Sequence, residues 1–336
     1  MRIAFVTTRP NKASFKFRVV QYLPYIEQKG LKYDILMLPR DFWSRRKFFN
    51  KLISYDVIFW QKRLLGRIDL WDLRRNSRYL IYDFDDSVMY NNTQNGNEYS
   101  YRLNRRFQNM VEHADLVIGG NPFLVEQAAP YADAQKLVRI PTVVDLEIWK
   151  TETPKTSATC DIIIGWVGSQ STLPYWMDKL ALWKTISRKY PQVVFKVTCD
   201  DVERTFSSPE YQDFRFQTVE WTEASQVRDC DVLDIGIMPL PDNRWSRGKC
   251  GFKLIQYLSL AKASVASPVG VNSDIILHGK TGLLAASNED WMNGLSLLIE
   301  NEEKRLELGS AGYQHVKENY SLQAWCDYLY SLLTRG

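Results

Sequence analysis

The chain is poor in the residues that mark small disulfide-bonded or zinc-binding domains. It has five cysteines and three histidines among 336 residues. The cysteines stand at 160, 199, 230, 250 and 326, with no Cys-x-x-Cys pair and no spacing typical of a zinc site. This pattern argues against both classes, and it predicts reduced thiols in a cytoplasmic protein.

The sequence also lacks a long apolar run, an internal repeat and a low-complexity tract. No segment approaches the roughly 20 apolar residues of a membrane-spanning helix. Residues 1–6 read as a buried strand and not as a signal peptide, because polar residues follow at once. Hydrophobic residues make up 45% and charged residues 24% of the chain, which is typical of a folded protein. Its length suits two domains of ordinary size.

Positive charge is concentrated near the N-terminus. Residues 1–80 hold 18 Lys and Arg against 6 Asp and Glu. Within them, residues 42–51 interleave four aromatic side chains with four cations. Such a basic and aromatic patch suits peripheral contact with an anionic membrane, at the inner face in a cytoplasmic protein. The alternative is an ordinary helix whose aromatics face its own core. We expect no nucleic acid partner, because no recognisable binding motif accompanies the charge.

Short apolar segments alternate with amphipathic ones along the chain. Strands are predicted at Arg2–Thr7, Tyr33–Met37, Val57–Gln61, Tyr79–Tyr82, Leu116–Gly119, Ile162–Val167, Val193–Thr198, Phe214–Gln217, Val232–Met238 and Ser264–Ala266. Helices are predicted at Phe17–Gln28, Arg102–His113, Pro122–Tyr131, Trp176–Lys189, Phe252–Ala261 and Leu322–Leu333. A polar linker, residues 151–159, separates two such arrays. This order predicts an α/β protein with two doubly wound, Rossmann-like domains facing across a cleft.

A basic, turn-rich loop, residues 239–251, leads into the helix predicted at Phe252–Ala261. Gly248 and Gly251 allow a ligand to approach the backbone closely, and the helix presents its positive dipole end there. Arg247, Lys249 and Lys253 add three cations at the same end. Since cations oppose the dipole at a helix N-terminus, the cluster predicts an anionic ligand such as a diphosphate.

Residues 251–285 resemble the nucleotide-sugar-binding core of the retaining glycosyltransferases of the GT-B fold, family four. The resemblance rests on Gly251-Phe252-Lys253, on Gln256, on the small residues at 261–266, and on the segments 268–270 and 278–285. Residues 140–145 resemble the signature that ends the first domain of that family. Residues 165–169 stand where the family has its first glycine loop of the donor domain. The family has two glutamates eight residues apart, and Gly248 and Gln256 replace them here.

The resemblance implies a GT-B enzyme whose substrates are a nucleotide diphosphate-sugar and a glycan or lipid-linked acceptor, with no cofactor and no metal. It implies an acceptor-side domain at 1–150, a donor-binding domain at 151–320 and a C-terminal helix, 321–336, that crosses back to the first domain. The expected donor-binding residues are Gly168, Ser169, Arg247, Lys249, Gly251, Phe252, Lys253 and Gln256.

An acidic cluster, Asp83, Asp85 and Asp86, follows the strand predicted at Tyr79–Tyr82. At a strand end it would face a ligand, and we expect Asp85 or Asp86 to orient or deprotonate the acceptor hydroxyl. The alternatives are a helix N-cap and a metal site. Arg9, Arg18 and Asp83 are further acceptor-side candidates. For Arg18 we also consider a surface ion pair with a carboxylate.

The sequence thus predicts a glycosyltransferase, retaining by resemblance, in surface polysaccharide or glycoconjugate synthesis. Two other classes stay open. One is a non-catalytic partner that binds a sugar nucleotide or a glycan, since both family glutamates are replaced. The other is a phosphotransfer enzyme that uses the Asp-x-Asp-Asp run.

Overall fold

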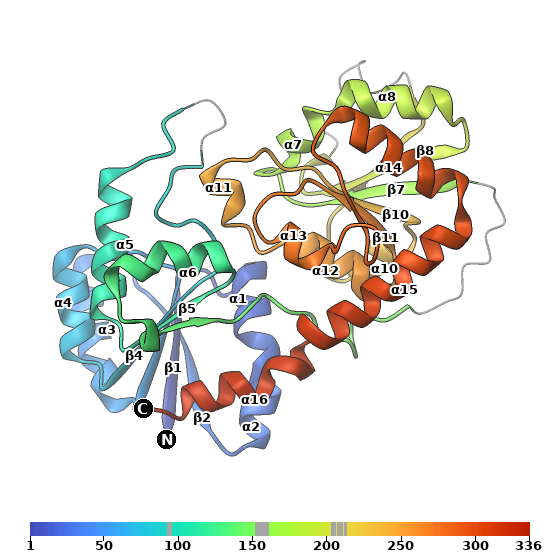
Figure 1. The fold of residues 1–336 in the computed structure, drawn as a ribbon. Coiled ribbons are helices and arrows are strands. Elements are labelled where there is room, and N and C mark those ends of the chain that lie inside the picture. The colour runs from blue at the N-terminus through green and yellow to red at the C-terminus, as the bar shows by residue number, and fades with distance from the viewer. Residues whose placement is uncertain (93–95, 152–160, 203–205, 207–210, 212–213) are drawn as a thin grey trace. The chain divides into compact units, whose positions relative to one another are not determined.

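The chain folds into two compact units, which Figure 1 draws as ribbons. The computed structural model describes residues 1–92, 96–151, 161–202, 206, 211 and 214–336. Unit 1 comprises Met1–Val143, Asn243–Cys250 and Leu322–Gly336, and unit 2 comprises Val144–Asp242 and Gly251–Ser321. The expected linker at 151–159 lies, apart from its first residue, outside the described residues. The segment Asn243–Cys250, which we expected in the donor-binding domain, groups with unit 1.

Unit 1 contains a six-stranded parallel sheet in the order β2-β1-β3-β4-β5-β6. Its strands are β1 (Arg2–Thr7), β2 (Lys32–Met37), β3 (Val57–Gln61), β4 (Tyr79–Phe84), β5 (Leu116–Gly119) and β6 (Leu137–Arg139). The order reverses between β1 and β3. Doubly wound sheets bind ligands beside the carboxyl ends of the strands at such a reversal.

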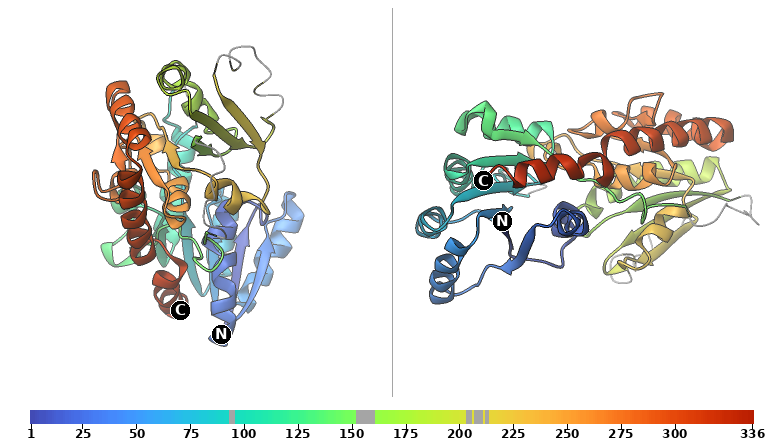
Figure 2. Two further views of the ribbon diagram at one scale, coloured as in Figure 1. Left: turned by 90° about the vertical axis from the view of Figure 1, so that its right-hand side faces the viewer. Right: turned by 90° about the horizontal axis from the view of Figure 1, so that it is seen from below.

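Helices cover both faces of this sheet, so its inner strands β1, β3, β4 and β5 are buried on both sides. They are α1 (Ala13–Arg18), α2 (Leu23–Gln28), α3 (Phe42–Lys51), α4 (Arg67–Arg75), α5 (Tyr101–His113), α6 (Pro122–Ala128), α11 (Arg244–Arg247) and α16 (Leu322–Leu333), with 3-10 turns at Val20–Tyr22, Leu52–Ser54, Ala129–Tyr131 and Ala134–Lys136. Alternate strand residues enter two separate cores. Helix α16 packs into the core that also holds residues of α1 and α2. Both chain termini lie in unit 1 (Figure 2).

Unit 2 contains a second six-stranded parallel sheet, in the order β12-β11-β10-β7-β8-β9. Its strands are β7 (Ile162–Val167), β8 (Val193–Cys199), β9 (Phe216–Glu220), β10 (Ile235–Met238), β11 (Ala263–Ala266) and β12 (Leu283–Leu284). Its helices are α7 (Leu173–Met177), α8 (Leu180–Lys189), α10 (Gln226–Asp231), α12 (Phe252–Ser259), α13 (Asn272–Ile275), α14 (Asn288–Glu300) and α15 (Glu302–Asn319). The order reverses between β7 and β10, as in a Rossmann sheet.

The predicted fold class, α/β with two doubly wound parallel sheets, is confirmed. Two predicted helices are wrong because each is broken in two. The helix predicted at Phe17–Gln28 is interrupted before α2, which has a proline in its first turn. The helix predicted at Trp176–Lys189 begins earlier, again with a proline in the first turn, and breaks between α7 and α8. Proline lacks the backbone N–H that a helix interior needs, so it is tolerated at a helix start.

None of the helices in the described ranges has the length and apolar character that crossing a bilayer requires.

Candidate functional site

The carboxyl edge of the first sheet gathers the acidic cluster. Strand β4 ends at Phe84, so Asp83 is its last residue but one, while Asp85 and Asp86 lie in the bend that follows. No helix begins at this bend, and the carboxylates bond cationic and hydroxyl side chains. The N-cap alternative for the cluster is therefore wrong.

Arg18 and Asp83 form a buried ion pair beneath this edge. Arg18 is 4% exposed and Asp83 is 0% exposed, and two guanidinium nitrogens of Arg18 donate to the Asp83 carboxylate. A further nitrogen donates to the carbonyl of Ile140 at 2.5 Å. Burial alone would lower the pKa of Arg18, but the adjacent carboxylate raises it above its ordinary value. The surface location that we considered for Arg18 is wrong, because the pair joins α1 to β4 inside the unit.

Lys62 lies directly after β3 and bridges the other two carboxylates. Its ammonium contacts Asp85 Oδ1 at 3.1 Å and also bonds Asp86. Its backbone N–H donates to the carbonyl of Asp83 at 2.7 Å, and its φ is +65°. A left-handed conformation is costly for a residue with a side chain, and strain of this kind is common at functional sites. Burial opposes the charge of Lys62, yet the two carboxylates raise its pKa.

Asp86 lies between two lysines. Its second oxygen is 3.2 Å from the ammonium of Lys249, and its side chain is 24% exposed. Burial alone would raise the pKa of Asp86, but Lys249 and Lys62 outweigh it and hold that pKa below its usual range. Asp86 is therefore ionised at neutral pH. It is a weak base but an able acceptor of hydrogen bonds.

Asp85 is more deeply held than Asp86. It is 8% exposed, and it accepts a hydrogen bond from the hydroxyl of Ser14 at 2.6 Å. Its carbonyl accepts from the thiol of Cys250 at 2.9 Å. Burial, with the help of nearby Asp85, raises the pKa of Cys250 to about 12, so this thiol stays protonated. Asp85 thus ties three segments of unit 1 together.

The segment Asn243–Cys250 contacts this edge through several hydrogen bonds. The side-chain amide of Asn121 donates to the carbonyls of Lys249, at 2.9 Å, and Arg247, at 3.3 Å. The hydroxyl of Ser87 donates to the carbonyl of Arg244 at 2.9 Å. A Cβ at Gly248 would lie 1.9 Å from the Ser87 oxygen, so no residue with a side chain fits there without rearrangement. Glycine at this position is a packing requirement of unit 1.

In unit 2, helix α12 is fixed at the reversal of the second sheet. The hydroxyl of Tyr257 accepts a hydrogen bond from the backbone N–H of Val167, at the end of β7, at 2.9 Å. Its ring packs against Gly236, and a Cβ at that position would lie only 2.3 Å from a ring carbon of Tyr257. Gly251 precedes the helix with a φ of +64°, which glycine adopts at no steric cost. The start of α12 is therefore held beside the loop after β7.

Lys253, in the first turn of α12, meets that loop. Its ammonium is 3.3 Å from the hydroxyl of Thr172 and 5.1 Å from the centre of the Trp166 ring. A Cβ at Gly168 would lie 2.8 Å from the Lys253 side chain and 2.4 Å from Trp166. A cation, a glycine loop and a helix N-terminus therefore meet at the carboxyl end of β7. Phosphate groups bind at such places.

The other predicted site residues lie outside the two clusters around Lys62 and Lys253, or at their margins. Arg9 and Ser169 are exposed on the loops after β1 and β7, and Arg247 is exposed on α11. Phe252 is half-buried at the start of α12, while Gln256 is 5% exposed in the same helix. Among the described residues, no group of three or more His, Cys, Asp or Glu side chains is arranged to hold a metal ion.

Comparisons with known proteins support the fold. No protein-family model matches the chain, and no curated protein matches it. The structure is similar to that of HepE from Anabaena, crystallised with UDP and glucose, at a TM-score of 0.74 and 14% identity over 100% of both chains. It is also similar to sucrose-phosphate synthase from Thermosynechococcus elongatus, with a TM-score of 0.77 and 14% sequence identity over 99% of this chain and 98% of that chain. The structure of a glycosyltransferase from Rickettsia africae matches with a TM-score of 0.75 and 11% sequence identity, over 100% of this chain and 99% of that chain. The chain has the GT-B fold.

Lys62 and Ser14 are the site residues that sequence reasoning missed. Lys62 follows a strand end, as Asp85 does, so the same rule of strand ends would have selected it. Its left-handed backbone and its two ion pairs have no local sequence signal. Ser14 becomes relevant only through its hydrogen bond to Asp85, 71 residues away.

Replacing Lys62 with Met should lower the free energy of unfolding by about 2 kcal/mol, between the values for exposed and buried pairs, because a buried and a partly exposed carboxylate lose their shared cation. Lys62→Gly removes the same charge but relieves the left-handed backbone by about 1 kcal/mol, so it should destabilise less. Lys62→Arg keeps the charge and serves as the matched control. Urea unfolding at pH 7 measures all three.

The same variants should differ in how their stability depends on pH in the acid range. The pKa of Asp86 is lower in the folded protein than in the unfolded chain, so its stabilisation is present at neutral pH. This stabilisation is lost as the pH falls below about 4, the pKa of Asp in the unfolded chain, and then through the lower pKa of Asp86 in the folded protein. Without Lys62 this loss should begin at a higher pH. Unfolding energies within about 0.5 kcal/mol of wild type, with unchanged acid unfolding, would contradict the assigned role.

Proposed function

We propose that the chain is a glycosyltransferase that moves a sugar from a nucleotide diphosphate-sugar to a hydroxyl of a glycan or lipid-linked acceptor. The observation that carries the proposal is the meeting of Lys253, Gly168 and the start of α12 at the reversal of the second sheet. HepE, with the same fold, was crystallised with UDP and with UDP-glucose. A retaining outcome and a role in surface polysaccharide or glycoconjugate synthesis rest on the family resemblance.

The chemistry of transfer explains why a fixed cation belongs there. When the bond between sugar and diphosphate breaks, the diphosphate gains negative charge. Preorganised cations and backbone N–H groups stabilise such charge without a metal ion. Arg247 and Lys249 were predicted to share this role. Both lie in unit 1, and Lys249 is engaged with Asp86, so the donor proposal rests chiefly on Lys253.

Lys253→Ala should raise the dissociation constant of UDP by more than tenfold. A charge-assisted contact to phosphate is worth on the order of 1.5–3 kcal/mol. Isothermal titration of wild type, Lys253→Ala and the exposed control Arg188→Ala measures the effect. The control should bind like wild type, and equal affinities in all three proteins would rule out the assignment.

On the acceptor side, we propose that Asp86 accepts a hydrogen bond from the acceptor hydroxyl, with Asp85 holding Lys62 and Ser14 in place. Asp86 is the more exposed of the two and stays ionised at neutral pH. Asp86→Asn and Asp85→Asn should therefore misplace the acceptor hydroxyl and slow transfer by roughly 10²-fold. Donor affinity should stay near the wild-type value, because the lost contact is to the acceptor and not to the donor.

A purely structural role predicts another result for these variants, namely lower stability with near-normal turnover of the folded protein.

A chelation assay is the control for metal chemistry. Transfer should survive EDTA, because protein cations stand on the leaving-group side. Loss of activity in EDTA with recovery in Mg²⁺ or Mn²⁺ would instead favour a metal or phosphotransfer role for Asp83 and Asp85.

A non-catalytic partner that binds a sugar nucleotide is the second candidate, and the packing around Gly248 favours it. The first family glutamate would need a side chain where the Ser87 hydroxyl already lies. Binding of the donor with neither transfer nor hydrolysis would support this candidate.

We also propose peripheral contact with the cytoplasmic face of an anionic membrane through residues 42–51. Helix α3 buries Phe49 completely, while Phe42 is 51% and Trp43 is 75% exposed. Only part of the aromatic set thus faces the core of the unit. Trp43→Ser should reduce co-sedimentation with vesicles that contain phosphatidylglycerol, and an unchanged bound fraction would count against the contact.

A further inference from the structure

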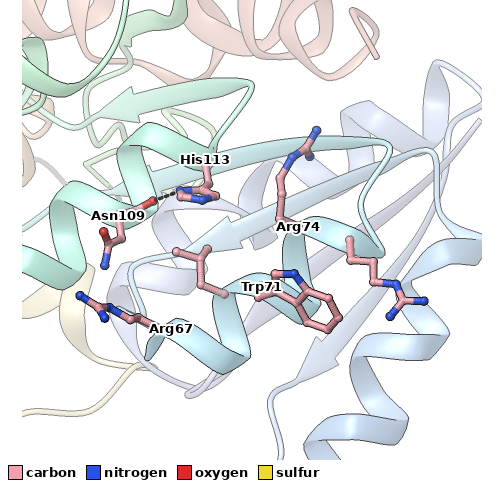
Figure 3. Close-up of a pocket in the computed structure, with 7 residues that line it drawn as sticks. Arg67, Trp71, Arg74, Asn109 and His113 are labelled. Carbon is pink, nitrogen blue, oxygen red and sulfur yellow. Dashed lines mark hydrogen bonds between the residues drawn. The ribbon is translucent and has the colours of Figure 1, made fainter.

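An open surface cavity of about 450 Å³ lies on helices α4 and α5, and its lining includes none of the residues predicted for the donor or acceptor. Figure 3 shows the side chains around it, with Arg67, Trp71 and Arg74 on α4 and with Asn109 and His113 on α5. Leu70 and Arg75 complete the lining. The lining therefore holds three guanidinium groups and an imidazole but no carboxylate.

The neighbouring charges leave this cavity positive. Arg74 is held by Asp115, with N–O distances of 3.0 and 3.4 Å, and Arg75 lies 5.2 Å from the centre of the Trp71 ring. Arg67 is the first residue of α4, where a cation opposes the helix dipole. The acidic residues of α4 pair with helix α3, Asp69 with Arg45 and Asp72 with Arg46. Each of these carboxylates is therefore already engaged by an arginine of α3.

A second group of cations crowds the same end of α4. A guanidinium nitrogen of Arg106 is 3.7 Å from where a Cβ at Gly66 would lie. Burial lowers the pKa of Arg106, and the charges of Arg102 and Arg63 lower it further, while the carboxylate of Asp69 partly offsets them. Such crowding of like charges is unfavourable in the free protein, and a bound anion relieves it.

The chemistry of the lining indicates the ligand. Guanidinium groups match the oxygens of phosphate, and the volume exceeds that of a bare phosphate ion. The exposed indole of Trp71 offers an apolar wall for the carbon part of an ester, while Leu70 is 3% exposed and contributes little to it. Trp71 and Ile68, which are 58% and 62% exposed, lie on the outer face of α4. Exposed apolar side chains next to cations are typical of interfacial helices.

We propose that this cavity binds a phosphate ester, supplied by the headgroup of an anionic membrane lipid. The inference deepens the membrane contact proposed for residues 42–51 and rests on it for the source of the ligand. It adds a defined site to a surface that would otherwise attract lipid through charge and apolar area alone. The cavity can be tested without a membrane, so the two proposals can fail separately.

The test compares Arg67→Gln/Arg75→Gln with a control that removes two exposed cations of unit 2, Arg188→Gln/Lys280→Gln. Arg74 is kept because its pair with Asp115 supports the fold. In solution, glycerol 1-phosphate should cause saturable NMR shifts at the Trp71 indole and the Asn109 amide. The cavity variant should weaken this binding by about tenfold or more, and the control should not.

With vesicles of phosphatidylcholine and phosphatidylglycerol, the cavity variant should lose about thirtyfold in partitioning, given about 1 kcal/mol for each Arg near an anionic surface. The control should lose less than threefold. Three results would overturn the proposal: no saturable shift at Trp71 or Asn109, equal behaviour of the two double variants, or tighter binding of a short RNA than of the vesicles. If glycerol 1-phosphate binds while Trp43→Ser leaves vesicle binding intact, the cavity stands and the contact through residues 42–51 fails.

Discussion

The buried ion pair between Arg18 and Asp83 is the constraint on which the first site depends. A buried charge without a partner is strongly destabilising, so this pair fixes α1 against the end of β4. The carboxylates of Asp85 and Asp86 follow the same strand end, and Lys62, directly after the neighbouring strand, pairs with both. The result is a preorganised array of charges at the edge where doubly wound sheets bind their ligands.

Much of the fold was predictable because most strands are apolar on both faces, although the edge strands β2 and β9 carry exposed polar residues. The strands at Arg2–Thr7, Val57–Gln61 and Ile162–Val167 have the predicted bounds, since short apolar segments between turns leave few alternatives. Pro24 and Pro174 carried a signal for the starts of α2 and α7 that the predictions did not use, whereas the break between α7 and α8 contains no proline. The parallel order of each sheet followed from the alternation of strands and helices.

The site was predictable only in part. The rule of strand ends selected Asp85 and Asp86 correctly as neighbours at one edge, but not the lysines that hold them. Lys249 was assigned to a diphosphate from its place before a helix, whereas in the structure it pairs with Asp86. That pairing joins residues 163 positions apart, and no local pattern encodes it. Similarly, the sequence indicates a flexible turn at Gly248, whereas in the structure this glycine is required because Ser87 packs tightly against it.

Titrating the protein with UDP-, GDP- and ADP-sugars, each with and without glycan or lipid-linked acceptors, tests the central claim most directly. The account predicts saturable binding of one nucleotide class and release of its nucleoside diphosphate that speeds up when an acceptor is present. Failure of all three classes to bind would contradict the assignment of the second unit to donor binding. Binding without any release, with every acceptor, would contradict transfer itself.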